Sequence, residues 1–294
     1  MLKNAERSSP RAALEPGFRY CQGLLARYQN QPRAALRHLN MARRDGEWGD
    51  SALRSMVEIY LNPENETNWD NLEVDRPSEP SEGVRAAERL LREMPSSPRR
   101  EVLACYVLMA YKERNQIDRA VAMLLELLGV EKDYLPALVC LSQAYLMLKQ
   151  APKARNHLKR VAKIGFQAEL VDDFERGWLM LADVYIVGGK YDLAEELCWR
   201  CLASNKSCAK AWEFLGVVKE KEAAYKDAAS HYEKAWTYEN EASAAVGYKL
   251  SFNYLKAKKH VEAIDVCHKV LGQYPDYPRI KAEVLDVARE ALKP

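Results

Sequence analysis

The sequence predicts an all-α fold, a right-handed superhelical solenoid of about seven helix-turn-helix repeats followed by a C-terminal capping helix. Three observations lead to this prediction. Apolar residues recur with helical spacing, similar patterns return at intervals of about 34 residues, and the stretch 209–240 carries one complete repeat. A repeat array of this kind buries its apolar surface by stacking one helical hairpin on the next.

The stretch 209–240 defines the pattern that the rest of the chain copies. With Ala209 as position 1, positions 4, 7, 8, 20, 24 and 27 are Trp212, Leu215, Gly216, Ala228, Tyr232 and Ala235, which matches the tetratricopeptide repeat (TPR). The small residues let two antiparallel helices approach closely, and the large side chains fill the space around that contact. The sequence therefore predicts TPR hairpins.

The same numbering places the other repeats. They are expected to start at residues 16, 50, 101, 135, 175, 209 and 244, so that the solenoid occupies 16–277. A polar lead-in, 1–15, precedes it. The pair Gly188 and Gly189 predicts a hairpin turn. Residues 278–294 predict a capping helix that begins at Pro278 and carries charged residues on one face.

A loop insertion is expected at 61–83, between the two helices of the repeat that starts at residue 50. The segment is rich in Pro, Asn, Ser and Glu, and it has too few apolar residues to offset the entropy of ordering it. The second helix then resumes with Ala87, Leu91 and Met94 at the packing positions. A loop of this length is either a tolerated excursion or a functional element.

Composition gives no sign of a nucleic-acid or membrane protein. The 44 basic and 42 acidic residues leave a net charge of +2. The basic groups around 155–163 and 256–260 are therefore expected to be solvated helix faces rather than contacts for an acidic partner or a lipid head group. The chain lacks an apolar run of membrane-spanning length and an N-terminal apolar signal, which predicts a cytosolic, soluble protein without membrane insertion.

The sequence contains no enzyme signature. Phosphate-binding loops, H-E-x-x-H and G-x-S-x-G are absent, so no catalytic residue and no cofactor is predicted. Cys198 and Cys201 form a C-x-x-C close to Cys208, which raises the alternative of a metal or redox site. Cys198 and Cys201 occupy packing positions 24 and 27, however, and no second ligand pair follows. The three cysteines are therefore predicted to be core residues, with no bound metal.

Positions 2, 5, 9, 12 and 13 of each first helix are expected to line the concave surface. The pairing of Lys at position 5 with Asn at position 9, which grips a C-terminal carboxylate in peptide-binding TPR proteins, is absent. Apolar residues at these positions predict a partner-binding groove made by Val139, Leu146, Met147, Leu179, Ile186, Val187, Tyr248, Phe252 and Leu255. Such a strip suits a protein partner, for instance an amphipathic helix. The alternative is that closure of the superhelix buries part of it.

Several runs go beyond the repeat pattern: ALRHLNMARRDGEWG (35–49), EIYLNPENET (58–67), AYLMLKQAPKARNHLKRVAKI (144–164), LADVYIVGGKYDLAEELCWRCL (181–202) and AVGYKLSFNYLKAKKHVEAIDVCHKVL (245–271). With them the chain resembles the C-terminal part of the tetratricopeptide repeat protein 21 family, the large TPR subunit of the intraflagellar transport A complex. Family members are several times longer, so the resemblance covers their last seven repeats.

The resemblance implies a non-catalytic scaffold that acts in retrograde ciliary transport and in ciliary membrane-protein trafficking. It implies a place in the cytoplasm and the cilium, at the ciliary base and axoneme. The implied partners are the other A-complex subunits, namely the WD40-plus-TPR subunits and the small unstructured subunit, with no nucleic acid. The alternatives are a stand-alone cytosolic TPR adaptor or co-chaperone-like peptide-binding protein, and an enzyme regulator or metal protein that uses the three cysteines.

Overall fold

The computed structural model describes residues 14–29, 31–62 and 81–293. Most of the expected lead-in and of the expected insertion lies outside the described residues. All the regular secondary structure in the described part of the chain is helical, and that part contains no strand. It divides into two compact units, residues 1–157 and 158–294, which are taken separately below. The predicted all-α repeat fold is confirmed.

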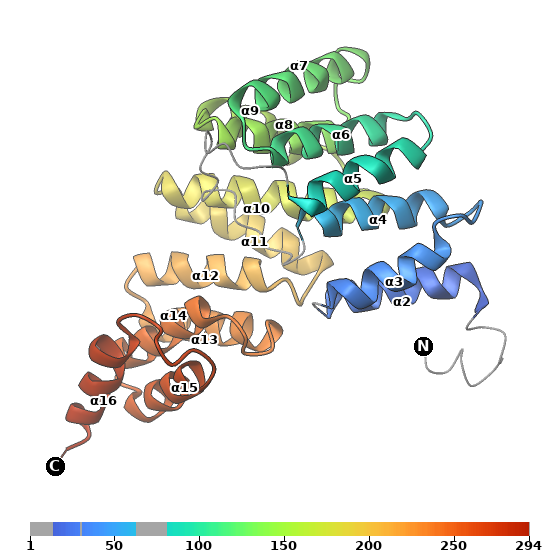
Figure 1. The fold of residues 1–294 in the computed structure, drawn as a ribbon. Helices are drawn as coiled ribbons and strands as arrows, with labels where there is room; N and C mark the ends of the chain where they lie inside the picture. Colours follow the sequence, from blue (N-terminus) through green and yellow to red (C-terminus); the bar gives the residue numbers. More distant parts are fainter. Residues whose placement is uncertain (1–13, 30, 63–80, 294) are drawn as a thin grey trace. The chain divides into compact units, whose positions relative to one another are not determined.

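The first unit is a series of helical hairpins (Figure 1). Its helices are α2 (Pro16–Tyr28), α3 (Pro32–Ala42), α4 (Gly49–Leu61), α5 (Glu82–Glu93), α6 (Pro98–Ala110), α7 (Arg114–Val130) and α8 (Leu135–Met147). The unit boundary falls inside the next helix, α9 (Ala151–Val161). Consecutive helices pack on each other, and α2, α4, α6 and α8 also pack in series. This double pattern of contacts is how helical-hairpin repeats stack.

Local sequence explains where these helices begin and how closely they pack. Proline occupies the first turn of α2, α3 and α6, where a missing N–H and a fixed φ favour helix initiation. Ser97 caps α6, because its hydroxyl accepts the backbone N–H of Arg100. A Cβ added at Gly23 would lie 2.6 Å from the Leu39 side chain, so α2 and α3 are in near backbone contact there.

The second unit continues with the same kind of hairpin (Figure 1). Its elements are a 3-10 turn η2 (Ala168–Leu170), α10 (Val171–Val187), α11 (Tyr191–Ser204), α12 (Ala209–Lys221), α13 (Tyr225–Tyr238), α14 (Ala244–Lys256), α15 (His260–Gln273), a π-helical turn η3 (Lys281–Leu285) and α16 (Asp286–Ala291). Helices α10 to α15 pack consecutively, and α10 also contacts α12. The π-helical turn η3 and helix α16 both pack on α15.

The hairpin of α12 and α13 is built as the repeat pattern predicts. Leu215, Ala228 and Tyr232 are completely buried, and Trp212 is 8% exposed. A Cβ added at Gly216 would lie 2.8 Å from the Tyr232 ring, so the glycine makes room for the tyrosine. The two helices of this hairpin therefore pack through the alternation of small and large residues that the sequence predicts.

Some helices begin elsewhere than the sequence pattern predicts. Helix α10 starts at Val171, one turn before residue 175. Two acidic residues in its first turn favour a helix start there, and Phe174 is fully buried against the Trp178 ring, 5.3 Å between centroids. The helical end of the chain starts at Lys281 rather than at Pro278, because Arg279 adopts a left-handed φ of 65°. That conformation does not continue a right-handed helix.

Candidate partner-binding surface

The predicted groove residues of the first unit lie on α8 and are largely inaccessible. Val139 is completely buried and Met147 is 5% exposed. Leu146 is partly exposed. Side chains that are already buried cannot present surface to a partner, so Val139 and Met147 serve the core of the chain.

Three predicted groove residues of the second unit lie on α10. Leu179 is 1% exposed and belongs to the core, and Ile186 is partly exposed. Val187 is 81% exposed at the end of the helix, next to the Gly188–Gly189 turn. Gly189 adopts a φ of 69°, as a turn glycine can. Of these three, only Val187 is a fully accessible apolar side chain.

The other three predicted residues, Tyr248, Phe252 and Leu255, lie on one face of α14 and are partly exposed. We call them the α14 aromatic surface. The rings of Tyr248 and Phe252 stack with 6.3 Å between centroids, and Tyr277 lies 6.2 Å from Tyr248. They form an aromatic centre that a partner side chain can contact.

Charged groups border the α14 aromatic surface. The Lys256 ammonium lies over the Phe252 ring, 5.3 Å from its centroid, in a cation–π contact. The Tyr248 hydroxyl donates a hydrogen bond to Glu283, and this bond, together with burial, raises the pKa of Tyr248 to about 12. The hydrogen bond to Glu283 holds the Tyr248 ring in place. An apolar centre with a polar rim is the arrangement of a protein-binding patch.

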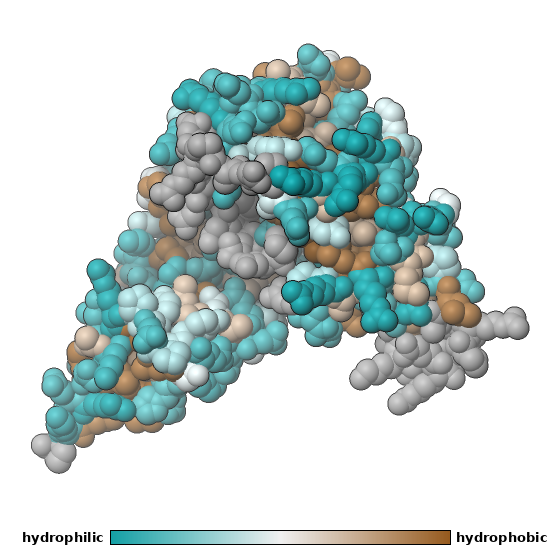
Figure 2. Space-filling model, in the orientation of Figure 1, coloured by the Kyte–Doolittle hydropathy of each residue, from teal (hydrophilic) through white to brown (hydrophobic). Residues whose placement is uncertain are grey.

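On the face drawn in Figure 2, hydrophilic residues cover most of the surface and hydrophobic residues appear between them in small groups. Across the described residues, no helix is both long enough and apolar enough to cross a membrane.

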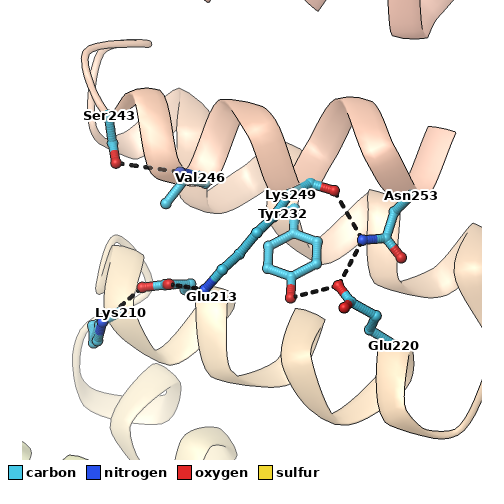
Figure 3. A network of polar contacts seen from close by, with 8 residues as sticks. All are labelled: Lys210, Glu213, Glu220, Tyr232, Ser243, Val246, Lys249 and Asn253. Carbon is cyan, nitrogen blue, oxygen red and sulfur yellow. Dashed lines mark hydrogen bonds and ion pairs between the residues drawn. The ribbon is translucent and has the colours of Figure 1, made fainter. Parts of the chain in front are cut away.

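A buried ion-pair group positions α14 against α12 (Figure 3). Glu213 of α12 is 8% exposed and receives Lys210 at 2.8 Å and Lys249 of α14 at 2.7 Å. Burial raises the pKa of Glu213, but the two lysines outweigh it and hold the pKa below its usual value. Glu213 is thus an ionised carboxylate that joins the two helices.

A second polar group continues the same seam (Figure 3). Glu220 accepts hydrogen bonds from the Tyr232 hydroxyl at 3.1 Å and from Nδ2 of Asn253 at 2.7 Å. Asn253 is completely buried and also donates to the backbone oxygen of Lys249 at 2.8 Å. Ser243 caps α14 by accepting the N–H of Val246. These bonds fix α14, and with it the α14 aromatic surface.

Sequence reasoning missed this α12–α14 polar seam. The only available signal was that Glu213 and Glu220 fall at concave positions 5 and 12, where a partner-facing or interhelical role is expected. The sequence does not show that their partners, Lys249 and Asn253, come from the next repeat.

The three cysteines that suggested a metal or redox site are core residues. Cys198 and Cys201 are completely buried, and Cys208 is 5% exposed. Burial raises the pKa of Cys198 and of Cys208 to about 12, so their thiols stay protonated at neutral pH. Within the described ranges, no group of His, Cys, Asp and Glu side chains is arranged to hold a metal ion.

These features define a helical-repeat protein of the TPR class, whose typical role is to present surfaces to other proteins. The sequence model of the tetratricopeptide repeat protein 21 C-terminal ARM domain matches residues 86–289, and that of the fifth ARM repeats domain of the same family matches residues 1–61. The chain belongs to the tetratricopeptide repeat protein 21 family, as its resemblance to that family predicted.

Curated relatives match almost the whole chain. Tetratricopeptide repeat protein 21B of Homo sapiens is 47% identical and protein 21A of Homo sapiens is 44% identical, each over 99% of this chain. The homologue of Caenorhabditis elegans is 32% identical over 99% of it. The chain spans 23% of the length of each of these three relatives.

Solved structures support the fold alone. The crystal structure of the APC/C hetero-tetramer Cut9-Hcn1 aligns with 99% of this chain and 52% of its own, with a TM-score of 0.65 at 13% identity. YrrB, a TPR protein with an unusual peptide-binding site, aligns with 69% of this chain and 96% of its own, with a TM-score of 0.50 at 16% identity.

Proposed function

We propose that the chain is a non-catalytic docking scaffold of the intraflagellar transport A complex, acting in retrograde ciliary transport and ciliary membrane-protein trafficking. The observation that carries the proposal is membership of the tetratricopeptide repeat protein 21 family, with 47% identity to a human relative over 99% of the chain. The proposed partners are the WD40-plus-TPR subunits and the small unstructured subunit of that complex. The proposed location is the cytoplasm and the cilium, at its base and axoneme.

The α14 aromatic surface is the proposed contact site. Aromatic side chains that are partly buried and held in place contribute strongly to protein binding, because little side-chain entropy is lost when a partner packs on them. Phe252 is stacked on Tyr248 and covered by Lys256, and the α12–α14 polar seam holds its helix. Of the predicted groove residues, Val187 alone is largely exposed, at 81%.

The proposal is tested by affinity isolation of the tagged chain from ciliated cells, with mass spectrometry of the proteins retained. Three forms are compared: wild type, Phe252→Ser, and Tyr238→Ser as a matched control. Tyr238 is a 46% exposed aromatic residue at the end of α13. We expect A-complex subunits with wild type and with the control, and a clear loss with Phe252→Ser.

Two outcomes contradict the proposal. If the wild-type chain retains no A-complex subunit while a full-length relative retains them in parallel, assembly does not use these repeats. If both serine variants behave like wild type, the contact lies elsewhere than the α14 aromatic surface. Retention of unrelated cytosolic proteins, together with direct binding of free C-terminal peptides, would favour the stand-alone adaptor instead.

A further inference from the structure

The hairpin of α2 and α3 has a local charge that the chain as a whole does not have. Residues 16–44 contain six arginines and one histidine but neither Asp nor Glu, whereas the full chain is almost balanced. The stretch ends at Asp45, whose carboxylate is used locally, since it accepts the backbone N–H groups of Glu47 and Trp48. The excess of positive charge therefore belongs to this hairpin.

Some of these arginines are neutralised within the first unit. Arg27 of α2 pairs with Glu58 of α4 at 2.8 Å, and Arg43 lies 3.6 Å from Glu93 of α5. Both partners are carboxylates from neighbouring helices. The hairpin thus already uses arginine to bind carboxylates, for which the planar guanidinium is well suited.

Three other arginines form an exposed row along α3 and the turn after it. Arg33, Arg37 and Met41 follow each other at intervals of one helical turn, and Arg44 lies in the turn directly after α3; all four are exposed. In the part of the chain that the structure describes, Arg33, Arg37 and Arg44 form no ion pair. Met41, 55% exposed, lies between the second and the third arginine. We call these four residues the α3 arginine row.

Neighbouring groups show that the positive charge extends from α3 to α2. Burial, Arg19 of α2 and Arg37 lower the pKa of His38, so the imidazole stays neutral beside two guanidinium groups. Nε of Arg19 and Nδ1 of His38 are buried and have no hydrogen-bond partner among the described residues. Like charges that gather without a carboxylate favour an anionic partner from outside.

We infer that the α3 arginine row is a docking site for an acidic, amphipathic segment of a partner protein. Its carboxylates would pair with Arg33, Arg37 and Arg44, and an apolar side chain between them would pack on Met41. An exposed methionine in the middle of the row favours such a segment over a phosphate backbone, which offers no apolar group at that point. The inference rests on the proposed scaffold function and adds the chemistry of one partner.

The test measures direct binding of a fluorescent synthetic peptide to the full chain by anisotropy. The probe is a helical peptide with Glu at every fourth position and one central Leu, and its control has Gln in place of each Glu. The test variant is Arg33→Gln/Arg37→Gln/Arg44→Gln. The matched control is Lys149→Gln/Lys159→Gln/Lys163→Gln, which removes three exposed cations in and around α9. Each triple variant changes the net charge from +2 to −1.

We expect the acidic peptide to bind in a salt-sensitive way, the arginine variant to weaken binding about tenfold, and the lysine variant to weaken it less than about twofold. Met41→Glu keeps all arginines and should also weaken binding, because it places a like charge opposite the peptide. Circular dichroism of each variant verifies that the substitutions at exposed positions leave the helices intact.

Equal weakening by the two triple variants would overturn the inference, since net charge alone would then explain binding. So would equal binding of the Gln peptide, or tighter, arginine-dependent binding of duplex DNA or phosphatidylserine vesicles, which would assign the row to another class of partner. These measurements use purified components. A failure to recover A-complex subunits from cells therefore contradicts the proposed function without changing the result for the α3 arginine row.

Discussion

Gly216→Ala tests whether the close approach of α12 and α13 controls the stability of this hairpin. The added methyl carbon would lie 2.8 Å from two ring atoms of Tyr232 and 2.9 Å from a third. Tyr232 is completely buried, and its hydroxyl is held by Glu220, so the ring has little freedom to move away. Overpacking of this kind costs about 1 to 3 kcal/mol.

Alanine also favours the helix over glycine by about 1 kcal/mol, which offsets part of that cost. We therefore expect Gly216→Ala to lower the free energy of unfolding by about 1 kcal/mol. Gly129→Ala is the matched control, because Gly129 lies in α7 with nothing within 4 Å of an added Cβ. It should raise the free energy of unfolding by about 0.5 to 1 kcal/mol.

Urea unfolding followed by far-UV circular dichroism measures the two variants against wild type. Because repeat arrays can unfold in parts, hydrogen exchange of residues 209–238 should accompany it and show faster exchange for Gly216→Ala. The reasoning is refuted if Gly216→Ala is as stable as Gly129→Ala, since the steric conflict would then be absent.

Three further predictions concern the second unit and its cysteines. Trp212→Ala removes a buried ring whose Nε1 donates to a backbone oxygen 3.0 Å away, and should lower the free energy of unfolding in urea by about 3 to 5 kcal/mol; a loss below about 1 kcal/mol contradicts a core role. The folded-state pKa of Glu213 lies below its usual value, so the stability it contributes is present above the unfolded pKa and lost as the pH falls through the folded pKa. Glu213→Gln should therefore lower stability by about 1 to 3 kcal/mol near pH 7 and by progressively less below about pH 4, and a pH-independent loss argues against the ion pairs. Burial raises the pKa of Cys198 and Cys208 to about 12, so in the folded chain iodoacetamide should label the exposed Cys21 much faster than these two cysteines. Equal labelling rates of the three cysteines, measured by peptide mass spectrometry, would contradict the burial of Cys198 and Cys208.

The hairpins could be predicted from the sequence because the pattern that makes them is local. Gly216, Ala228 and Tyr232 lie within one repeat, and their sizes alone show how two helices fit together. The buried cysteines follow from the same numbering. Where a helix start depends on a single backbone conformation, as at Arg279, the repeat pattern carries no information about it.

The partner-binding surface could be predicted only in part. Repeat numbering places Val139 and Leu179 at concave positions, but whether such a position is open depends on the neighbouring side chains that cover it. The same limit applies to the α12–α14 polar seam. Glu213 and Lys249 are 36 residues apart, and no local pattern shows that they meet.

The ion pair between Glu213 and Lys249 has a consequence for how the chain assembles itself. Hairpins made to one plan have similar apolar faces, so hydrophobic contact alone discriminates poorly between a correct neighbour and a wrong one. A wrong neighbour would leave the buried Glu213 carboxylate without Lys249, one of its two lysines, and the loss of a partner to a buried charge is destabilising. The ion pair between Glu213 and Lys249 therefore favours packing of the correct neighbouring hairpin over a wrong one.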